Sequence, residues 1–115
     1  MAHIAIIGST TWGTTLAIIN SGEGKHVSLL VRTKEESDLL RKHRENKRFL
    51  PGITFPDILE VTSKPQDLIP KTDLLIIAVP SQSLRENVRA ISSYVSASTI
   101  IVSASKGLES TSGMR

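Results

Sequence analysis

The chain has 115 residues, of which 39% are hydrophobic, 22% charged and only 3% aromatic. This composition excludes a disordered chain and predicts one globular domain with an aliphatic core. The formal net charge of +3 favours an anionic partner, and because the basic residues are spread along the chain, we expect a phosphorylated small molecule and no nucleic acid.

Apolar, strand-like runs alternate with helical patterns along the chain. We expect strands at residues 4–7, 27–31, 59–62, 74–79 and 99–103, and helices at 12–21, 34–43 and 81–94, with a short helical turn at 66–69. The first and fourth strands are almost continuously apolar, which predicts that both of their faces are covered. The sequence therefore predicts an α/β fold, a doubly wound parallel sheet of the Rossmann type with helices on both faces.

Residues 8–13, between the first strand and the first helix, have the spacing of a dinucleotide-binding turn. Gly8 would permit the tight turn out of the strand, and Gly13 would allow the helix to pack closely on the strand. Thr10 replaces the middle glycine of the pattern, so its side chain either pushes a pyrophosphate outward or offers it a hydroxyl. Because an imperfect glycine pattern is weakly specific, an ordinary strand-to-helix turn is the alternative.

The second strand ends at Arg32 and Thr33, in the position that selects the coenzyme. An acidic residue there usually binds the ribose 2′-hydroxyl of NAD, whereas arginine favours the 2′-phosphate of NADP. The first acidic residues follow only at Glu35 and Glu36. A guanidinium can bind a phosphate through two parallel bonds, and Thr33 can add its hydroxyl. The sequence thus favours NADP slightly over NAD, although Arg32 could also stack on adenine or be a solvated surface cation.

Two further strand ends carry residues suited to a ligand crevice. After the fourth strand, Pro80 sets the exit angle and Ser81 is predicted to cap the next helix. After the fifth strand, Lys106 is followed by Gly107, which permits an unusual backbone turn and places the lysine to meet an anion. A solvated surface lysine is the alternative.

The chain has no cysteine, which excludes disulfides and thiolate metal sites and fits a reducing compartment. Its first twenty residues include His3 and several hydroxyl side chains, so neither a signal-peptide core nor a membrane span can be drawn there. We therefore expect a cytoplasmic protein.

Four stretches, WGTTLA at 12–17, ENKRFLPG at 45–52, AVPSQ at 78–82 and VSASKGLE at 102–109, occur in an order and spacing that are together far more specific than a glycine pattern. They resemble the amino-terminal domain of bacterial NAD(P)-dependent glycerol-3-phosphate dehydrogenases. The resemblance covers nearly the whole chain. It implies an oxidoreductase that uses NAD or NADP to reduce dihydroxyacetone phosphate to sn-glycerol 3-phosphate for phospholipid synthesis.

The resemblance also implies roles for individual residues. Thr11 and Trp12 would hold the coenzyme at the glycine turn, Arg32 and Thr33 would meet the adenosine ribose, and Lys106 would contact both coenzyme and substrate. The family usually has Gly-Ala-Gly-Ser where this chain has Gly-Ser-Thr-Thr at 8–11, a departure that we expect to lower coenzyme affinity.

The family's chains are considerably longer, with a helical substrate domain that holds the general-acid lysine. We therefore expect residues 1–115 to be the dinucleotide-binding domain of a longer protein that can form a homodimer, and to have little activity alone. A non-catalytic coenzyme sensor is the alternative, but it has no need of Lys106 or of the 45–52 loop. A methyltransferase is disfavoured because it needs an acidic residue where Arg32 stands.

Overall fold

The computed structural model describes residues 2–22 and 25–104. Its main sheet has five parallel strands in the order β5-β2-β1-β6-β7. These are β1 (Ala2–Ile7), β2 (Lys25–Leu30), β5 (Glu60–Thr62), β6 (Leu74–Ile77) and β7 (Ile100–Ser103). The strand order reverses between β1 and β6, which lie side by side although β2 and β5 intervene in the sequence.

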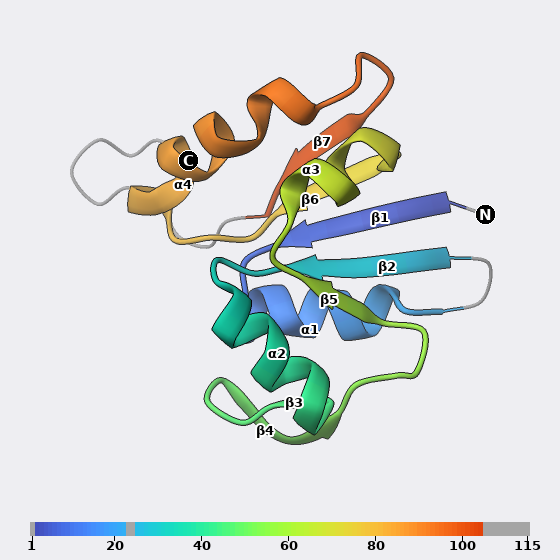
Figure 1. Ribbon diagram of the computed structural model, residues 1–115, viewed down its shortest axis with the longest axis vertical. Helices are drawn as coiled ribbons and strands as arrows, with labels where there is room; N and C mark the ends of the chain where they lie inside the picture. Colours follow the sequence, from blue (N-terminus) through green and yellow to red (C-terminus); the bar gives the residue numbers. More distant parts are fainter. Residues whose placement is uncertain (1, 23–24, 105–115) are drawn as a thin grey trace.

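Helices cover both faces of this sheet (Figure 1). One face carries α1 (Thr11–Asn20) and α2 (Lys34–His43). The other carries α3 (Pro65–Leu68), the 3-10 turn η1 (Ile69–Lys71), α4 (Ser81–Ile91) and the 3-10 turn η2 (Ser92–Tyr94). Within the described ranges, no helix has the length and apolar character needed to cross a membrane.

The side chains of β1 show why the sheet needs two layers of helices. Ile4 and Ile6 belong to the core shared with α1 and α2, whereas Ala5 and Ile7 belong to the core shared with α3 and α4. All four side chains are buried. Because successive side chains of a strand point to opposite faces of the sheet, both faces of β1 must be covered. The predicted doubly wound α/β fold is confirmed, and each predicted strand is present with its boundaries shifted by a few residues.

The structure corrects two local predictions. Residues 45–52 are not a loop, because β3 (Glu45–Asn46) and β4 (Leu50–Thr54) pair as an antiparallel hairpin outside the main sheet. The second correction concerns the start of α4, where Pro80 takes the capping position and Ser81 is already the first helical residue. Proline is suited to this place because it lacks an amide hydrogen that would need an acceptor.

The hairpin is joined to α2 by Arg44, whose backbone is left-handed with φ 52°. This conformation ends the helix and turns the chain into β3. The Arg44 guanidinium then donates hydrogen bonds to the carbonyl oxygens of Pro56, at 2.7 Å, and Leu59, at 2.9 Å. These contacts hold the segment between β4 and β5 against the end of α2. The hairpin itself lies beside α1 and α2 (Figure 1).

Candidate functional site

The carboxyl ends of β1, β2 and β6 meet around a cavity of about 460 Å³. We call it the strand-end cavity. Its wall includes Gly8, Ser9 and Thr10 after β1, Arg32 after β2, and Pro80 after β6, and it is closed by one side of α4. This is the place where strand order reverses, at which doubly wound sheets bind their ligands. Small-molecule sites commonly have volumes of roughly 300–1,000 Å³, and the strand-end cavity falls within this range.

The two predicted glycines act sterically as expected. Gly8 has φ +118°, and a Cβ there would overlap the backbone carbonyl of Ala78, at the end of β6. A Cβ at Gly13 would overlap the carbonyl oxygen of Gly8 itself. The chain can therefore turn sharply after β1, and α1 can pack closely against that turn, only with glycine at both positions. Contact of Gly8 and Gly13 with a coenzyme stays a prediction.

Thr10 occupies the capping position before α1, with φ −75° and an extended ψ of −177°. This backbone does not require glycine, and the Thr10 hydroxyl makes no capping bond. The side chain instead contributes to the wall of the strand-end cavity. Because α1 begins at the next residue, the cavity lies at a helix N-terminus, where unpaired amides and the helix dipole attract anions.

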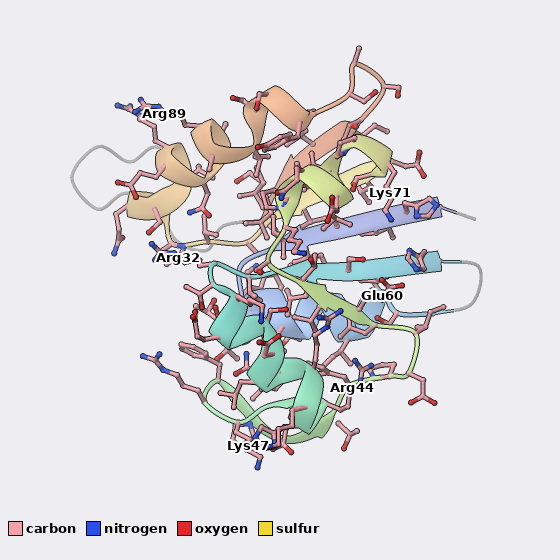
Figure 2. All side chains as sticks on the ribbon, viewed as in Figure 1. Arg32, Arg44, Lys47, Glu60, Lys71 and Arg89 are labelled. Carbon is pink, nitrogen blue, oxygen red and sulfur yellow. The ribbon has the colours of Figure 1, made fainter. Side chains whose placement is uncertain are left out.

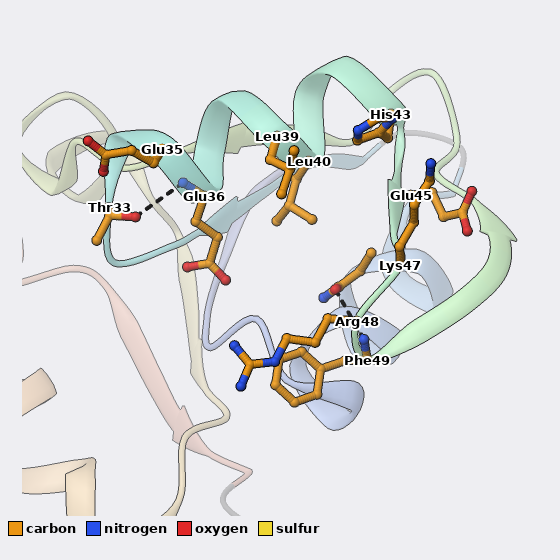
Figure 3. Close-up of a pocket in the computed structure, with 11 residues that line it drawn as sticks. Thr33, Glu35, Glu36, Leu39, Leu40, His43, Glu45, Lys47, Arg48 and Phe49 are labelled. Atoms are coloured by element: carbon orange, nitrogen blue, oxygen red, sulfur yellow. Dashed lines mark hydrogen bonds between the residues drawn. The ribbon is translucent and has the colours of Figure 1, made fainter.

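The two predicted ribose-binding residues lie in different places. Arg32 is exposed at the end of β2 and lines the strand-end cavity (Figure 2). Thr33 caps α2 by accepting a hydrogen bond from the backbone amide of Glu36 at 3.1 Å. Thr33 lines a neighbouring cavity of about 690 Å³, which lies between α2 and the hairpin and which we call the hairpin cavity (Figure 3). The structure thus places Arg32 in the same cavity as the glycine turn. Contact of either residue with the adenosine ribose stays a prediction.

The hairpin holds the glycine turn through Asn46, which is only 3% exposed. Its side-chain amide donates to the carbonyl oxygen of Ser9 at 2.6 Å and to the hydroxyl of Thr14 at 2.9 Å. The Thr11 hydroxyl donates to the carbonyl oxygen of Phe49 at 2.8 Å, and the predicted role of Thr11 in holding the coenzyme stays a prediction. Sequence reasoning missed this function of Asn46, and the one signal for it was its place in the ENKRFLPG stretch.

Trp12 connects the first turn of α1 to the end of the edge strand β7. Its indole Nε1 donates to the carbonyl oxygen of Ala104 at 2.5 Å, directly after β7. The ring also packs against the core that α1 and α2 share with the sheet. Trp12 is therefore held at the exit of β7, although its contact with a coenzyme stays a prediction. Lys106 lies outside the described residues, so its predicted role also stays a prediction.

Comparison with known protein families gives one match over almost the whole chain. Residues 3–115 match the family model described as NAD-dependent glycerol-3-phosphate dehydrogenase N-terminus. A curated relative from Chlorobium luteolum, named glycerol-3-phosphate dehydrogenase, NAD(P)+, is 44% identical over 113 residues. The match covers 98% of this chain and 34% of the relative. A relative of the same name from Syntrophomonas wolfei is 41% identical over 100% of this chain and 34% of its own length.

Solved structures show the same similarity. The crystal structure of glycerol-3-phosphate dehydrogenase from Coxiella burnetii aligns with a TM-score of 0.86 and 28% identity, over 96% of this chain and 34% of that one. The Saccharomyces cerevisiae enzyme structure aligns with a TM-score of 0.79 and 25% identity, over 94% and 34% of the two chains. The chain thus spans about a third of the length of these proteins.

Proposed function

We propose that this chain, which belongs to the family of NAD-dependent glycerol-3-phosphate dehydrogenases as an amino-terminal domain, binds NAD or NADP in the strand-end cavity. One observation carries the proposal. The glycine turn, the end of β2 with Arg32, and the exit of β6 form the wall of a single cavity at the point where strand order reverses.

The chain's own residues would bind and orient the coenzyme. The glycine turn and the N-terminus of α1 are suited to the pyrophosphate, because a positive dipole end meets the negative charge there. Arg32 is suited to the adenosine end, where it favours the 2′-phosphate of NADP. Trp12 keeps the start of α1 against the exit of β7 through its bond to Ala104.

For a protein that carries this domain together with a substrate domain, we infer reduction of dihydroxyacetone phosphate to sn-glycerol 3-phosphate. The names of the relatives support this reaction. The coenzyme would supply the hydride, and Lys106 would contact the phosphorylated substrate. We further propose a cytoplasmic enzyme that can form a homodimer. The relatives are dehydrogenases, which favours this function over a sensor or a methyltransferase.

Arg32→Ala tests the preference for NADP. We expect the binding free energy for NADPH to weaken by about 2 kcal/mol, which is within the range for hydrogen bonds to charged groups, and that for NADH to weaken less. Calorimetric titration of the chain with each coenzyme measures both values. Arg89→Ala is the matched control, because Arg89 is an exposed arginine on α4 that points away from the sheet (Figure 2).

If Arg32→Ala lowered the affinities for NADPH and NADH equally, this would indicate that Arg32 stacks on adenine, and it would contradict the preference for NADP. A wild-type chain that bound neither coenzyme would contradict the proposed function itself.

Thr10→Gly tests the cost of a side chain in the glycine turn. Because Thr10 lines the strand-end cavity and caps nothing, we expect coenzyme binding to tighten by about 1 kcal/mol. The same titration measures the change. Thr10→Ala is the control, because it removes the hydroxyl but keeps the Cβ, and it should bind as the wild type does. Weaker binding in both variants would show instead that the hydroxyl makes a useful contact.

A further inference from the structure

Glu36 makes half of a capping motif at the start of α2. The Thr33-x-x-Glu36 spacing predicts a reciprocal capping box, in which the threonine hydroxyl accepts from the glutamate amide and the glutamate carboxylate returns to the threonine amide. The first bond is present, at 3.1 Å. The carboxylate instead accepts a hydrogen bond from the Ser9 hydroxyl at 2.5 Å. Figure 3 shows the Glu36 side chain pointing away from Thr33 into the hairpin cavity, whereas Glu35 points outward.

The hydrogen bond places a carboxylate against the glycine turn. Ser9 directly follows Gly8 and lines the strand-end cavity, as does Arg32. In doubly wound folds the adenosine ribose lies between the end of the second strand and the glycine turn. The Ser9 hydroxyl donates and the Glu36 carboxylate accepts, so Ser9 fixes the position of the carboxyl group. The Glu36 carboxylate, which lines the hairpin cavity, therefore lies within hydrogen-bond distance of Ser9, which lines the strand-end cavity.

We propose that Glu36, held by Ser9, is a specificity-determining residue that disfavours a 2′-phosphate, with Ser9 as its positioning residue. The proposal rests on the proposed function. In the described part of the chain, Glu36 and Arg32 form no ion pair with each other, so their charges act separately on a ligand. A 2′-phosphate is repelled by the carboxylate and attracted by the guanidinium, whereas a 2′-hydroxyl can donate to the carboxylate. The preference for NADP that Arg32 creates is thereby kept small.

The test compares the Kd values for NADPH and NADH in the 115-residue chain. Glu36→Gln removes the charge but keeps an oxygen that can accept from Ser9, so the fold should be retained. We expect it to shift the affinity ratio about tenfold toward NADPH, which corresponds to about 1.4 kcal/mol. Glu35→Gln is the matched control, because it removes the same charge from the neighbouring exposed position, and it should leave the ratio within about twofold.

Ser9→Ala is the second variant, and it keeps the charge while removing the hydroxyl that positions it. The freed carboxylate can turn to the Thr33 amide and complete the capping box. We expect a shift toward NADPH in the same direction but smaller, about threefold. Circular dichroism establishes whether each variant is folded. If Glu36→Gln fails to fold, the ratio of the NADPH and NADH Kd values in Ser9→Ala tests the proposal in its place.

The outcomes separate the two proposals. If the wild type binds neither coenzyme, the proposed function is contradicted. If the wild type binds but Glu36→Gln leaves the ratio unchanged, or Glu35→Gln changes it equally, the inference about Glu36 is overturned. A ratio that responds to Glu36→Gln and not to Ser9→Ala overturns the positioning role of Ser9.

Discussion

Gly8→Ala is expected to lower the free energy of unfolding by about 4 kcal/mol, from two costs that add. The backbone at Gly8 has φ +118°, a region that costs residues with a side chain about 1–3 kcal/mol. The new Cβ would also overlap the carbonyl group of Ala78, and overpacking of this kind costs about 1–3 kcal/mol. Ala78 cannot easily move away, because it is buried and its amide donates to Ile7 at 2.8 Å.

Denaturant unfolding followed by circular dichroism measures this change, and Gly22→Ala is its control. A Cβ at Gly22 would meet no atom within 4 Å, and Gly22 lacks the positive φ found at Gly8. We expect Gly22→Ala to leave stability unchanged or to raise it by up to about 1 kcal/mol, through the loss of unfolded-state entropy. A Gly8→Ala variant within about 1 kcal/mol of the wild type would show that the turn can relax around a side chain.

Asn46→Ala is expected to cost about 3 kcal/mol, because one buried side chain holds three groups. Its amide donates to the Ser9 carbonyl and the Thr14 hydroxyl, and its oxygen accepts from the Phe49 amide at 3.3 Å. Removing a hydrogen-bond partner costs more than the bond itself when the groups left behind are buried. Because Ser9 lines the strand-end cavity, we also expect weaker coenzyme binding in the variant.

Asn20→Ala is the control for this second variant. Among the residues that the structure describes, the Asn20 side-chain amide donates to the carbonyl oxygen of Leu16 in its own helix, at 2.8 Å. We expect its loss to cost no more than about 1 kcal/mol and to leave the coenzyme Kd unchanged. Equal destabilisation by both changes would mean that the hairpin contributes little to holding the glycine turn.

The predicted fold was correct because it rests on local patterns. Apolar runs interrupted by helical periodicity predict alternating strands and helices, whichever partners they later find. Gly8 is required by its positive φ and by the close approach of the Ala78 carbonyl, and Gly13 is required because a Cβ there would overlap the Gly8 carbonyl oxygen. Residues 45–54 lacked such a pattern. Their strands are short and include Pro51 and Gly52, and within the described part of the chain they form a separate two-stranded sheet.

The contacts that shape the candidate site join residues far apart in the chain. The Glu36 carboxylate binds Ser9 across 27 residues, Asn46 binds Ser9 across 37, and Trp12 binds Ala104 across 92. The local spacing favours the Thr33 amide as the partner of the Glu36 carboxylate, yet the carboxylate accepts from the distant Ser9 hydroxyl instead. Packing of α2 and the hairpin against the glycine turn makes that choice, and it places the carboxylate beside Ser9.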